Sequence, residues 1–347
     1  MSDLSTVSQN SAIDEKELYR ITAKYQKPHL GKAIWQLVNT FVPYIALWVL
    51  MAYTIRRGHP YWITLLLAAL ASGFLVRIFI FFHDCGHQSF FASRRANTIL
   101  GYICGTLTFT PFEDWSHSHG IHHNTAGNLD RRGTGDVWTM TVKEYLAAPW
   151  QERLAYRLFR TPLITFILGP IGVFVLGQRF PTKGANRRDI ISVIVTDLAI
   201  LAMIVLLSFA MGFWTYLLIQ LPLTIMGGGM GIWLFYVQHQ FEGVYWARHD
   251  KWDRLKSALE GSSYYKLPKV LQWFTGNIGL HHVHHIRPRI PNYNLQQAYD
   301  EVGVFQTVKP VTIGGSLKSL RMNLWDEERQ KLVSFRSLRV QSRAGAA

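Results

Sequence analysis

The chain has 347 residues, of which 49% are apolar and only 17% are charged. Because the apolar residues gather in long uncharged runs, this composition excludes an ordinary soluble domain. The net charge of +14 would suit a nucleic-acid-binding protein, but most Lys and Arg lie outside the apolar runs, on an N-terminal arm, a middle segment and a C-terminal tail. That distribution favours an anionic membrane surface, with an acidic protein partner as a weaker inference. We expect no nucleic-acid partner.

Three apolar runs are long enough to cross a membrane. Residues 33–55 contain no charged side chain, and residues 61–82 contain only Arg77. Residues 190–240 contain only Asp197 and are long enough for two spans. A helix of about 20 apolar residues spans the hydrocarbon core of a bilayer, so we expect an all-α integral membrane protein with four transmembrane helices in two hairpins. The predicted spans are about 33–55, 61–82, 190–210 and 214–238.

Polar segments flank the apolar part. We divide the chain into an N-terminal arm (residues 1–32), a membrane domain (residues 33–335) and a polar tail (residues 336–347). The first apolar run starts too late and is too long for a signal peptide, so we expect no cleavage. The positive-inside rule places the arm, the middle segment and the tail in the cytoplasm. We recognise no appended electron-transfer module.

The middle section, residues 83–189, contains two shorter apolar stretches. Residues 96–112 and 162–176 are each short or broken for a full span, so we expect neither to cross the membrane. Residues 143–160 between them mix apolar and basic side chains, as a helix lying on the membrane surface does.

Eight histidines form three clusters with helical spacing. The clusters read HDCGH, HGIHH and HHVHH, and their spaced members are His83, His87, His119, His122, His123, His281, His284 and His285. Residues three or four positions apart lie on one side of a helix, so each cluster gathers its imidazoles there. His117 and His282 fall outside that side. Such a concentration of histidines has no common structural role except metal binding.

The number of clustered histidines indicates two metal ions. A zinc ion usually takes four ligands, and a structural zinc site prefers cysteine, so eight imidazoles exceed one such ion. Two ions sharing eight or nine ligands fit the count, but imidazole suits iron, copper, zinc and nickel. His239, at the end of the fourth predicted span, is the candidate ninth ligand or else a residue of the membrane interface. His59 and His249 are interpreted as interface residues or as satisfied hydrogen-bonding groups.

Metal-binding imidazoles normally donate their second nitrogen to a carboxylate or a carbonyl. The candidate partners near the clusters are Asp84, Glu113, Asp114, Asp136 and Glu242. Asp197, inside a predicted span, is either functional or paired within its hairpin. The three clusters meet at one membrane–cytoplasm boundary if the two short apolar stretches do not cross. We therefore expect a cytoplasmic helical cap that holds a di-metal site.

The three clusters, in this order, resemble the histidine boxes of the membrane fatty acid desaturases, which read HxxxH or HxxxxH and then HxxHH twice. The resemblance runs from about residue 30 to about residue 335. Flanking phrases such as FHDCGHQSFF, TGNIGLHHVHH and LWDEE are more specific than the boxes, and they resemble the Δ5 acyl-lipid desaturases of the Bacillus type. The boxes alone are also similar to those of membrane hydroxylases, so a di-iron hydroxylase of alkyl chains or carotenoids is the alternative.

The resemblance implies that the box histidines hold two iron ions, with His239 as an additional ligand and no other catalytic residue. Hydrogen is removed from two neighbouring carbons of an acyl chain, a cis double bond forms, and dioxygen is reduced to two waters. Two electrons come from the substrate and two from a separate donor, which the resemblance identifies as ferredoxin or a flavodoxin. The implied substrate is a membrane phospholipid in the plasma membrane of a bacterial cell, with the active site on the cytoplasmic side.

A metal-binding membrane sensor or transporter is the alternative from a different class of protein. It needs polar residues along a path through the spans. Arg77 and Asp197 are the only charged residues in the predicted spans, which favours the enzyme.

Overall fold

The four predicted spans are long helices in the computed structural model, which describes residues 15–338. They are α2 (Leu30–Arg56), α3 (Tyr61–Gly86), α8 (Arg187–Met211) and α9 (Phe213–His239). Each is long and apolar enough to cross a membrane, with a mean hydropathy between 1.5 and 2.8. All four extend slightly past the predicted bounds, because polar residues form their first or last turns. The predicted helical membrane architecture is confirmed.

Large apolar side chains cover the outer faces of these helices. Trp35 of α2 is 66% exposed, and Leu206 and Phe209 of α8 are 67% and 86% exposed. A soluble monomer rarely exposes apolar surface on this scale, whereas lipid chains cover it favourably. Together with the four long helices, this surface makes the chain an integral membrane protein.

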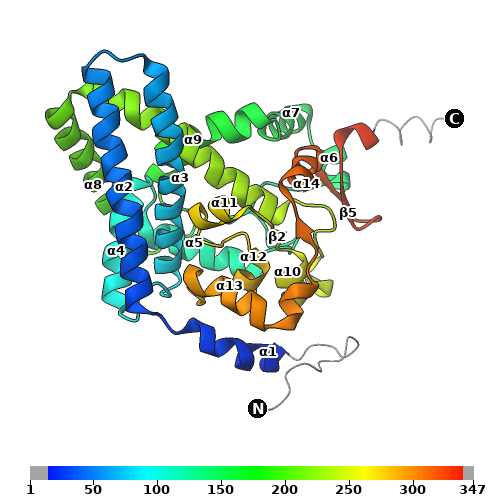
Figure 1. Cartoon of the computed structure of the whole chain (residues 1–347). Helices are drawn as coiled ribbons and strands as arrows, with labels where there is room; N and C mark the ends of the chain where they lie inside the picture. Colours follow the sequence, from blue (N-terminus) through cyan, green and yellow to red (C-terminus); the bar gives the residue numbers. More distant parts are fainter. Residues whose placement is uncertain (1–14, 339–347) are drawn as a thin grey trace.

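The two hairpins turn at the same end of the bundle (Figure 1). The turns contain Gly58 and Gly212, both with a positive φ that glycine adopts without strain. Arg56 Nη2 donates to the carbonyl of Ala210 at 3.0 Å and so links the two turns. The histidine-bearing segments lie at the other end, among the shorter helices of a cap (Figure 1).

The rest of the chain forms shorter helices and two small sheets. The α-helices are α4 (Arg94–Leu107), α5 (Phe112–Thr125), α6 (Val142–Ala147), α7 (Trp150–Phe159), α10 (Arg254–Glu260), α11 (Lys269–Phe274), α12 (His281–Ile286), α13 (Asn292–Glu301) and α14 (Ile313–Ser316). The 3-10 turns among them are η5 (His249–Lys251), η6 (Gly303–Thr307) and η7 (Leu317–Arg321). α4 packs against α3 and α8.

The two sheets lie in the cap. In one, β4 (Leu324–Asp326) lies between β1 (Met140–Thr141), which is parallel to it, and β5 (Lys331–Val333), which is antiparallel. In the other, β2 (Tyr264–Tyr265) pairs in parallel with β3 (Pro310–Val311). The all-α prediction omits these strands, because two or three residues are too few to show an alternating pattern.

The N-terminal arm packs beneath the cap. Its first residues, 1–14, lie outside the described residues, and the rest forms α1 (Glu15–Thr22) and η1 (Ala23–Gln26). Leu18 of α1 is 1% exposed and belongs to the same apolar cluster as Val283 and Ile286 of α12. The arm therefore supports the helix that carries the third histidine cluster. Most of the predicted tail, residues 339–347, also lies outside the described residues.

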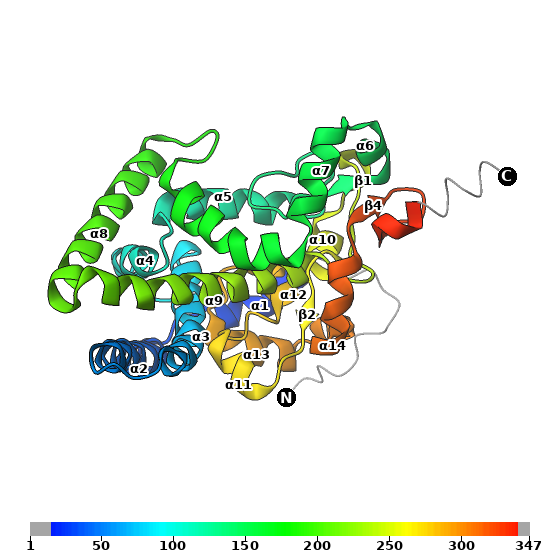
Figure 2. The same cartoon turned by 90° about the horizontal axis from the view of Figure 1, so that it is seen from above.

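A broken helix between α7 and α8 packs against α9, and Figure 2 shows it in green beside that helix. It consists of the π-helical turns η2 (Leu163–Leu168) and η3 (Ile171–Leu176) and the 3-10 turn η4 (Gly177–Arg179), and it is bent by 67° from α7. Pro162 and Pro170 precede the two π turns, and a proline has no N–H for the helical ladder. That this segment does not cross the membrane stays a prediction.

Two successive glycines of α9, Gly228 and Gly229, allow the broken helix to approach closely. A Cβ on Gly229 would lie 2.5 Å from the carbonyl oxygen of Phe166, and a Cβ on Gly228 would lie 2.8 Å from the Pro170 ring. Both distances are shorter than van der Waals contact. Larger residues at these positions would therefore push the broken helix away from α9.

We expect Gly229→Ala to lower the free energy of unfolding by about 1–3 kcal/mol, because the added methyl group overpacks this contact. Gly231→Ala is the matched control, since a Cβ at Gly231 on the same helix meets no atom within 4 Å. Thermal unfolding of the two variants in the same detergent measures the difference. Equal unfolding midpoints would contradict the packing argument.

Both charged residues inside the predicted spans have structural partners. Asp197 of α8 pairs with Arg179 of η4. Arg77 of α3 donates to Thr40 Oγ1 at 3.0 Å and to the carbonyl of Trp273, and its guanidinium lies 4.1 Å from the Trp273 ring centre. Charged groups at membrane depth need such partners. Asp197 therefore holds η4 against α8, and its partner is not in its own hairpin.

Candidate metal centre

Nine histidines from four segments converge at the cap end of the bundle. α3 and the residue after it supply His83 and His87, α5 supplies His119, His122 and His123, α9 ends on His239, and α12 supplies His281, His284 and His285. The structure thus brings together every histidine that the sequence singled out as a candidate ligand. It arranges them in two groups.

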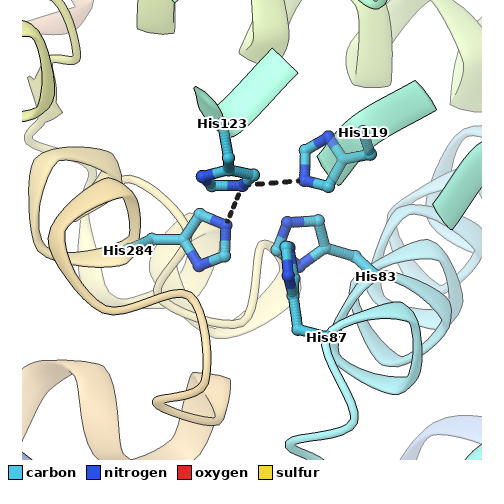
Figure 3. Close-up of side chains that lie close together, drawn as sticks. All are labelled: His83, His87, His119, His123 and His284. Carbon is cyan, nitrogen blue, oxygen red and sulfur yellow. Dashed lines mark hydrogen bonds between the residues drawn. The ribbon is translucent and has the colours of Figure 1, made fainter. Parts of the chain in front are cut away.

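The first group contains five histidines (Figure 3). They are His83, His87, His119, His123 and His284, and one ring nitrogen from each lies within 4.8 Å of the others. His123 Nε2 is 3.1 Å from His119 Nε2 and 3.0 Å from His284 Nε2. Two imidazole nitrogens at right angles on one metal ion, each about 2.1 Å from it, are about 3.0 Å apart. These spacings therefore fit neighbouring ligands of a single ion.

The second group contains four buried histidines, His122, His239, His281 and His285. His239 Nε2 lies 3.1 Å from His122 Nε2 and 3.0 Å from His281 Nε2. The rings of His123 and His285, one from each group, have centroids 4.2 Å apart. The two groups are therefore adjacent, and together they make a candidate di-metal site.

Helical spacing explains how α5 and α12 each serve both groups. Consecutive residues of a helix differ by about 100° around the axis, so His119 and His123 are about 40° apart, whereas His122 is about 60° away on the other side. His119 and His123 accordingly lie in the first group and His122 in the second. On α12, His281 and His285 lie in the second group and His284 in the first.

The donor pattern of the second group fits a cation. His122 Nδ1 lies 2.7 Å from Asp136 Oδ1, and His239 Nδ1 lies 3.2 Å from the carbonyl of Gly261. Because both partners only accept, each Nδ1 carries the ring proton and each Nε2 presents a lone pair. The two lone pairs face each other at 3.1 Å, which is repulsive unless a cation lies between them. In the first group, the buried Nε2 of His87 has no hydrogen-bond partner among the described residues.

Burial keeps six of the nine imidazoles neutral. Loss of solvation, followed by the neighbouring imidazoles, lowers the pKa well below its usual value for His87, His119, His123, His281, His284 and His285. A neutral imidazole retains the lone pair that a metal ion needs. These six imidazoles therefore offer their lone pairs to a metal ion at neutral pH.

Two of the five predicted carboxylate partners lie next to the histidines. Asp136 accepts from His122, as described above. Asp84 Oδ1 is 3.4 Å from His83 Nδ1, and its Oδ2 accepts from the backbone and side-chain nitrogens of Asn292 at 2.7 and 2.8 Å. Asp84 therefore connects the first histidine cluster to the start of α13.

The other three carboxylates have different surroundings. Asp114 accepts from the backbone and hydroxyl of Thr182. The backbone of Glu113 donates to Ser192. Glu242 is 73% exposed at its side chain and pairs with Lys318 at 3.0 Å. Within residues 15–338, none of the three is hydrogen-bonded to a histidine of either group.

The two remaining histidines of the clusters point elsewhere. His282 is buried, and its Nε2 lies 3.0 Å from the carbonyl of Phe305. Burial lowers its pKa to about 4, so it is neutral and donates to that carbonyl. His117 Nδ1 lies 2.7 Å from Asp189 Oδ2, outside both groups.

Sequence reasoning missed Arg160, a buried arginine beside the second group. Its Nη1 donates to Tyr236 Oη at 2.9 Å and to Gln240 Oε1 at 3.2 Å, and its Nη2 donates to the carbonyl of Trp138 at 2.7 Å and to Thr139 Oγ1 at 3.1 Å. It is 5% exposed and forms no ion pair with a described carboxylate. Tyr236 and Gln240 flank His239, whereas Trp138 and Thr139 follow Asp136. Arg160 thus joins the segments that carry His239 and the partner of His122.

We expect Arg160→Gln to lower the free energy of unfolding by about 1–3 kcal/mol, because buried acceptors lose their donors. Metal retained by the second group should fall as well, since His239 and Asp136 lose their common support. Arg153→Gln, a change on helix α7, which ends one residue before Arg160, is the control because it lies away from this network. Calorimetry and elemental analysis of both variants test this expectation. If the Arg160→Gln protein is less stable but binds as much metal as wild type, Arg160 contributes to folding and does not support the metal site.

Aromatic rings cover the histidines on the side of the membrane helices. The Trp115 ring stacks on His119 with centroids 4.3 Å apart. Phe235 lies 5.3 Å from the His122 ring and 5.1 Å from the His239 ring. These rings place an apolar surface beside both groups.

Comparison with known proteins decides the family. A family model described as "Fatty acid desaturase" matches residues 59–307. The chain belongs to the fatty acid desaturase family. It is 48% identical to a fatty acid desaturase of Bacillus subtilis (strain 168) over 331 residues, which are 95% of this chain and 94% of that protein. The predicted assignment to the membrane fatty acid desaturases, an oxidoreductase family, is confirmed.

More distant relatives carry more specific names. The desaturase is 27% identical to an sn-1 acyl-lipid omega-3 desaturase (ferredoxin) of a Nostoc species, over 65% of this chain and 63% of that protein. It is 24% identical to an sn-1 oleoyl-lipid 12-desaturase of a Picosynechococcus species, over 73% of each chain. The histidine groups therefore belong to a metal site typical of desaturases.

Proposed function

We propose that this desaturase introduces a cis double bond into an acyl chain of a membrane lipid, using two iron ions held by the nine histidines. The facing Nε2 lone pairs of His122 and His239, 3.1 Å apart, are the observation that carries the metal assignment. His83, His87, His119, His123 and His284 would hold one ion, and His122, His239, His281 and His285 the other. When bound, the ions supply, with dioxygen, the oxidising power that an unactivated C–H bond requires. Zinc has no redox chemistry, which favours iron.

The chain's own residues prepare the site for this chemistry. Asp136 and the carbonyl of Gly261 hold the protons of His122 and His239 on Nδ1, which leaves each Nε2 free to bind metal. Trp115 and Phe235 offer an apolar surface beside the histidines to a methylene chain.

The substrate and the electron donor are inferred from the position of the site and from the relatives. The histidines lie at the end of the membrane helices. Beside α3, the helix α11 exposes Val270 and Leu271 at 67% and 44%. A lipid acyl chain can reach this region from the bilayer. Relatives at 24–27% identity are named for acyl-lipid or oleoyl-lipid substrates, and some for ferredoxin. Ferredoxin or a flavodoxin is therefore the proposed donor.

The deciding experiment incubates membranes that contain the desaturase with dioxygen and a reduced ferredoxin. Mass spectrometry of the lipids should show the loss of two hydrogen atoms from an acyl chain, and fragmentation locates the bond. Gain of one oxygen atom would instead indicate the hydroxylase. Elemental analysis of active enzyme should find about two irons per chain. If elemental analysis finds zinc and no iron in active enzyme, the assignment of iron is wrong.

We also propose that the enzyme lies in the bacterial plasma membrane with the histidine end in the cytoplasm, since the polar, basic segments surround that end. A cysteine introduced at His59, in the exposed first turn, should react with an impermeant thiol reagent added to intact cells. A cysteine at exposed Lys256 of α10 should react only after permeabilisation. The native Cys85 and Cys104 are buried, so they give a low background. Labelling of Lys256→Cys in intact cells would show that the protein has the opposite orientation in the membrane.

A further inference from the structure

A cleft opens between the two hairpins at the end of the bundle opposite the histidines. It has a volume of about 560 Å³ and lies between α2, α8 and α9, the helices that Figure 2 shows from above. Leu107 of α4 lies at its base, and its walls include Val49 and Ala52 of α2 and Leu207 of α8. None of the nine histidines lines it, so it is separate from the metal centre.

The depth of the cleft matches one leaflet of a bilayer. It extends along α2 from Tyr44 to Arg56. Twelve residues of helix at 1.5 Å each span about 18 Å. Half of the hydrocarbon core of a typical bilayer is about 15 Å thick. An extended acyl chain of the leaflet on this side would therefore lie along the apolar walls, with its polar end at the level of Arg56.

The mouth of the cleft is basic. Arg56 and Arg57 line it, together with Gln220 of α9. Arg56 Nη2 donates to the carbonyl of Ala210. The guanidinium carbon of Arg57 lies 5.5 Å from the centre of the Tyr53 ring. Neither arginine forms an ion pair with any carboxylate among residues 15–338. Two cations without a counter-ion at the membrane boundary complement a phosphodiester, which accepts several charge-assisted hydrogen bonds from guanidinium groups.

We propose that this cleft binds one anionic phospholipid of the leaflet opposite the histidine end. Its acyl chain fills the gap between the hairpins, and its headgroup phosphate contacts Arg56 and Arg57. The lipid would add apolar contacts between α2 and α8 along the cleft, beside the direct contacts of Arg56 with Ala210 and of Trp48 with Tyr216, and so stabilise the bundle. It would not be a substrate, because its chain occupies the end of the bundle away from the histidines.

Native mass spectrometry of the full-length desaturase, released from nanodiscs of equal parts phosphatidylglycerol and phosphatidylcholine, tests this proposal. Wild-type protein should retain one phosphatidylglycerol. The double variant Arg56→Gln/Arg57→Gln should lower its retention relative to phosphatidylcholine by about 30-fold, since each of the two basic residues contributes about 1 kcal/mol near a lipid surface and about 1.4 kcal/mol corresponds to tenfold. The matched control is Arg94→Gln/Arg95→Gln, two exposed arginines at the start of α4 near the other end of the bundle.

A second variant tests whether the acyl chain of the lipid lies in the cleft. Ala52→Phe fills the wall of the cleft and should reduce retention of both lipids, while the basic mouth remains. Unchanged retention in Ala52→Phe would place the lipid elsewhere, and equal retention of the two lipids by wild-type protein would remove the role of the arginines. Dimers in place of lipid-bound monomers would assign the cleft to a second copy of the chain. Each of these three outcomes overturns the proposal.

Discussion

His284→Ala is expected to lower desaturation by more than about 100-fold, beyond the usual cost of losing an outer hydrogen-bond partner. His284 Nε2 lies 3.0 Å from His123 Nε2 in the five-histidine group, so its loss opens the ligand set of that group. His281→Ala and His285→Ala should have the same effect through the four-histidine group. Iron content and lipid desaturation, measured on membranes with matched protein amounts, test the three variants.

His282→Ala is the control within the same six-residue helix. Its ring is buried but faces the carbonyl of Phe305 at 3.0 Å, away from both groups. We expect its loss to reduce stability by about 1–3 kcal/mol, because a buried acceptor loses its donor, while iron content and turnover remain measurable. A His282→Ala protein without iron beside an active His281→Ala protein would show that the ligand assignment is wrong by one residue.

Asp136→Asn is the change with the second largest expected effect. The carboxylate accepts from His122 Nδ1 at 2.7 Å and so fixes the proton on that nitrogen. Asparagine keeps the shape but removes the charge that makes His122 a stronger ligand. We expect metal affinity or activity to fall by about 10- to 100-fold. Competition with a chelator, followed by elemental analysis, measures the affinity without relying on turnover.

Glu242→Gln provides the comparison for Asp136→Asn. Both carboxylates lie near a histidine in the sequence, but Glu242 is exposed and pairs with Lys318. An exposed ion pair contributes little, so stability should stay within about 0.5 kcal/mol of wild type and iron content should not change. If Glu242→Gln loses iron and Asp136→Asn retains it, the structure assigns the wrong carboxylate to the site.

The sequence alone determined the membrane architecture and the candidate histidines. Runs of uncharged residues predicted the four long helices, because the thickness of a bilayer sets the length of a span. Spacings of three and four predicted which histidines share a side of α5 and of α12, because that relation depends only on the helical repeat. Both are local properties, and the histidine boxes added the family.

Only the tertiary structure decided how these histidines are divided and what supports them. His122 and His123 are neighbours in the chain, yet they belong to different groups, because their partners come from α9, α3 and α12. Of the five carboxylates that lie near the clusters, only Asp84 and Asp136 lie beside a histidine of either group. Glu242 follows His239 by three residues but points to the surface, because α9 ends at His239. Arg160 stands alone in the sequence, and its role at the second group arises from contacts with residues up to 80 positions away. Distance along the chain does not determine such contacts, since they depend on how separate helices pack.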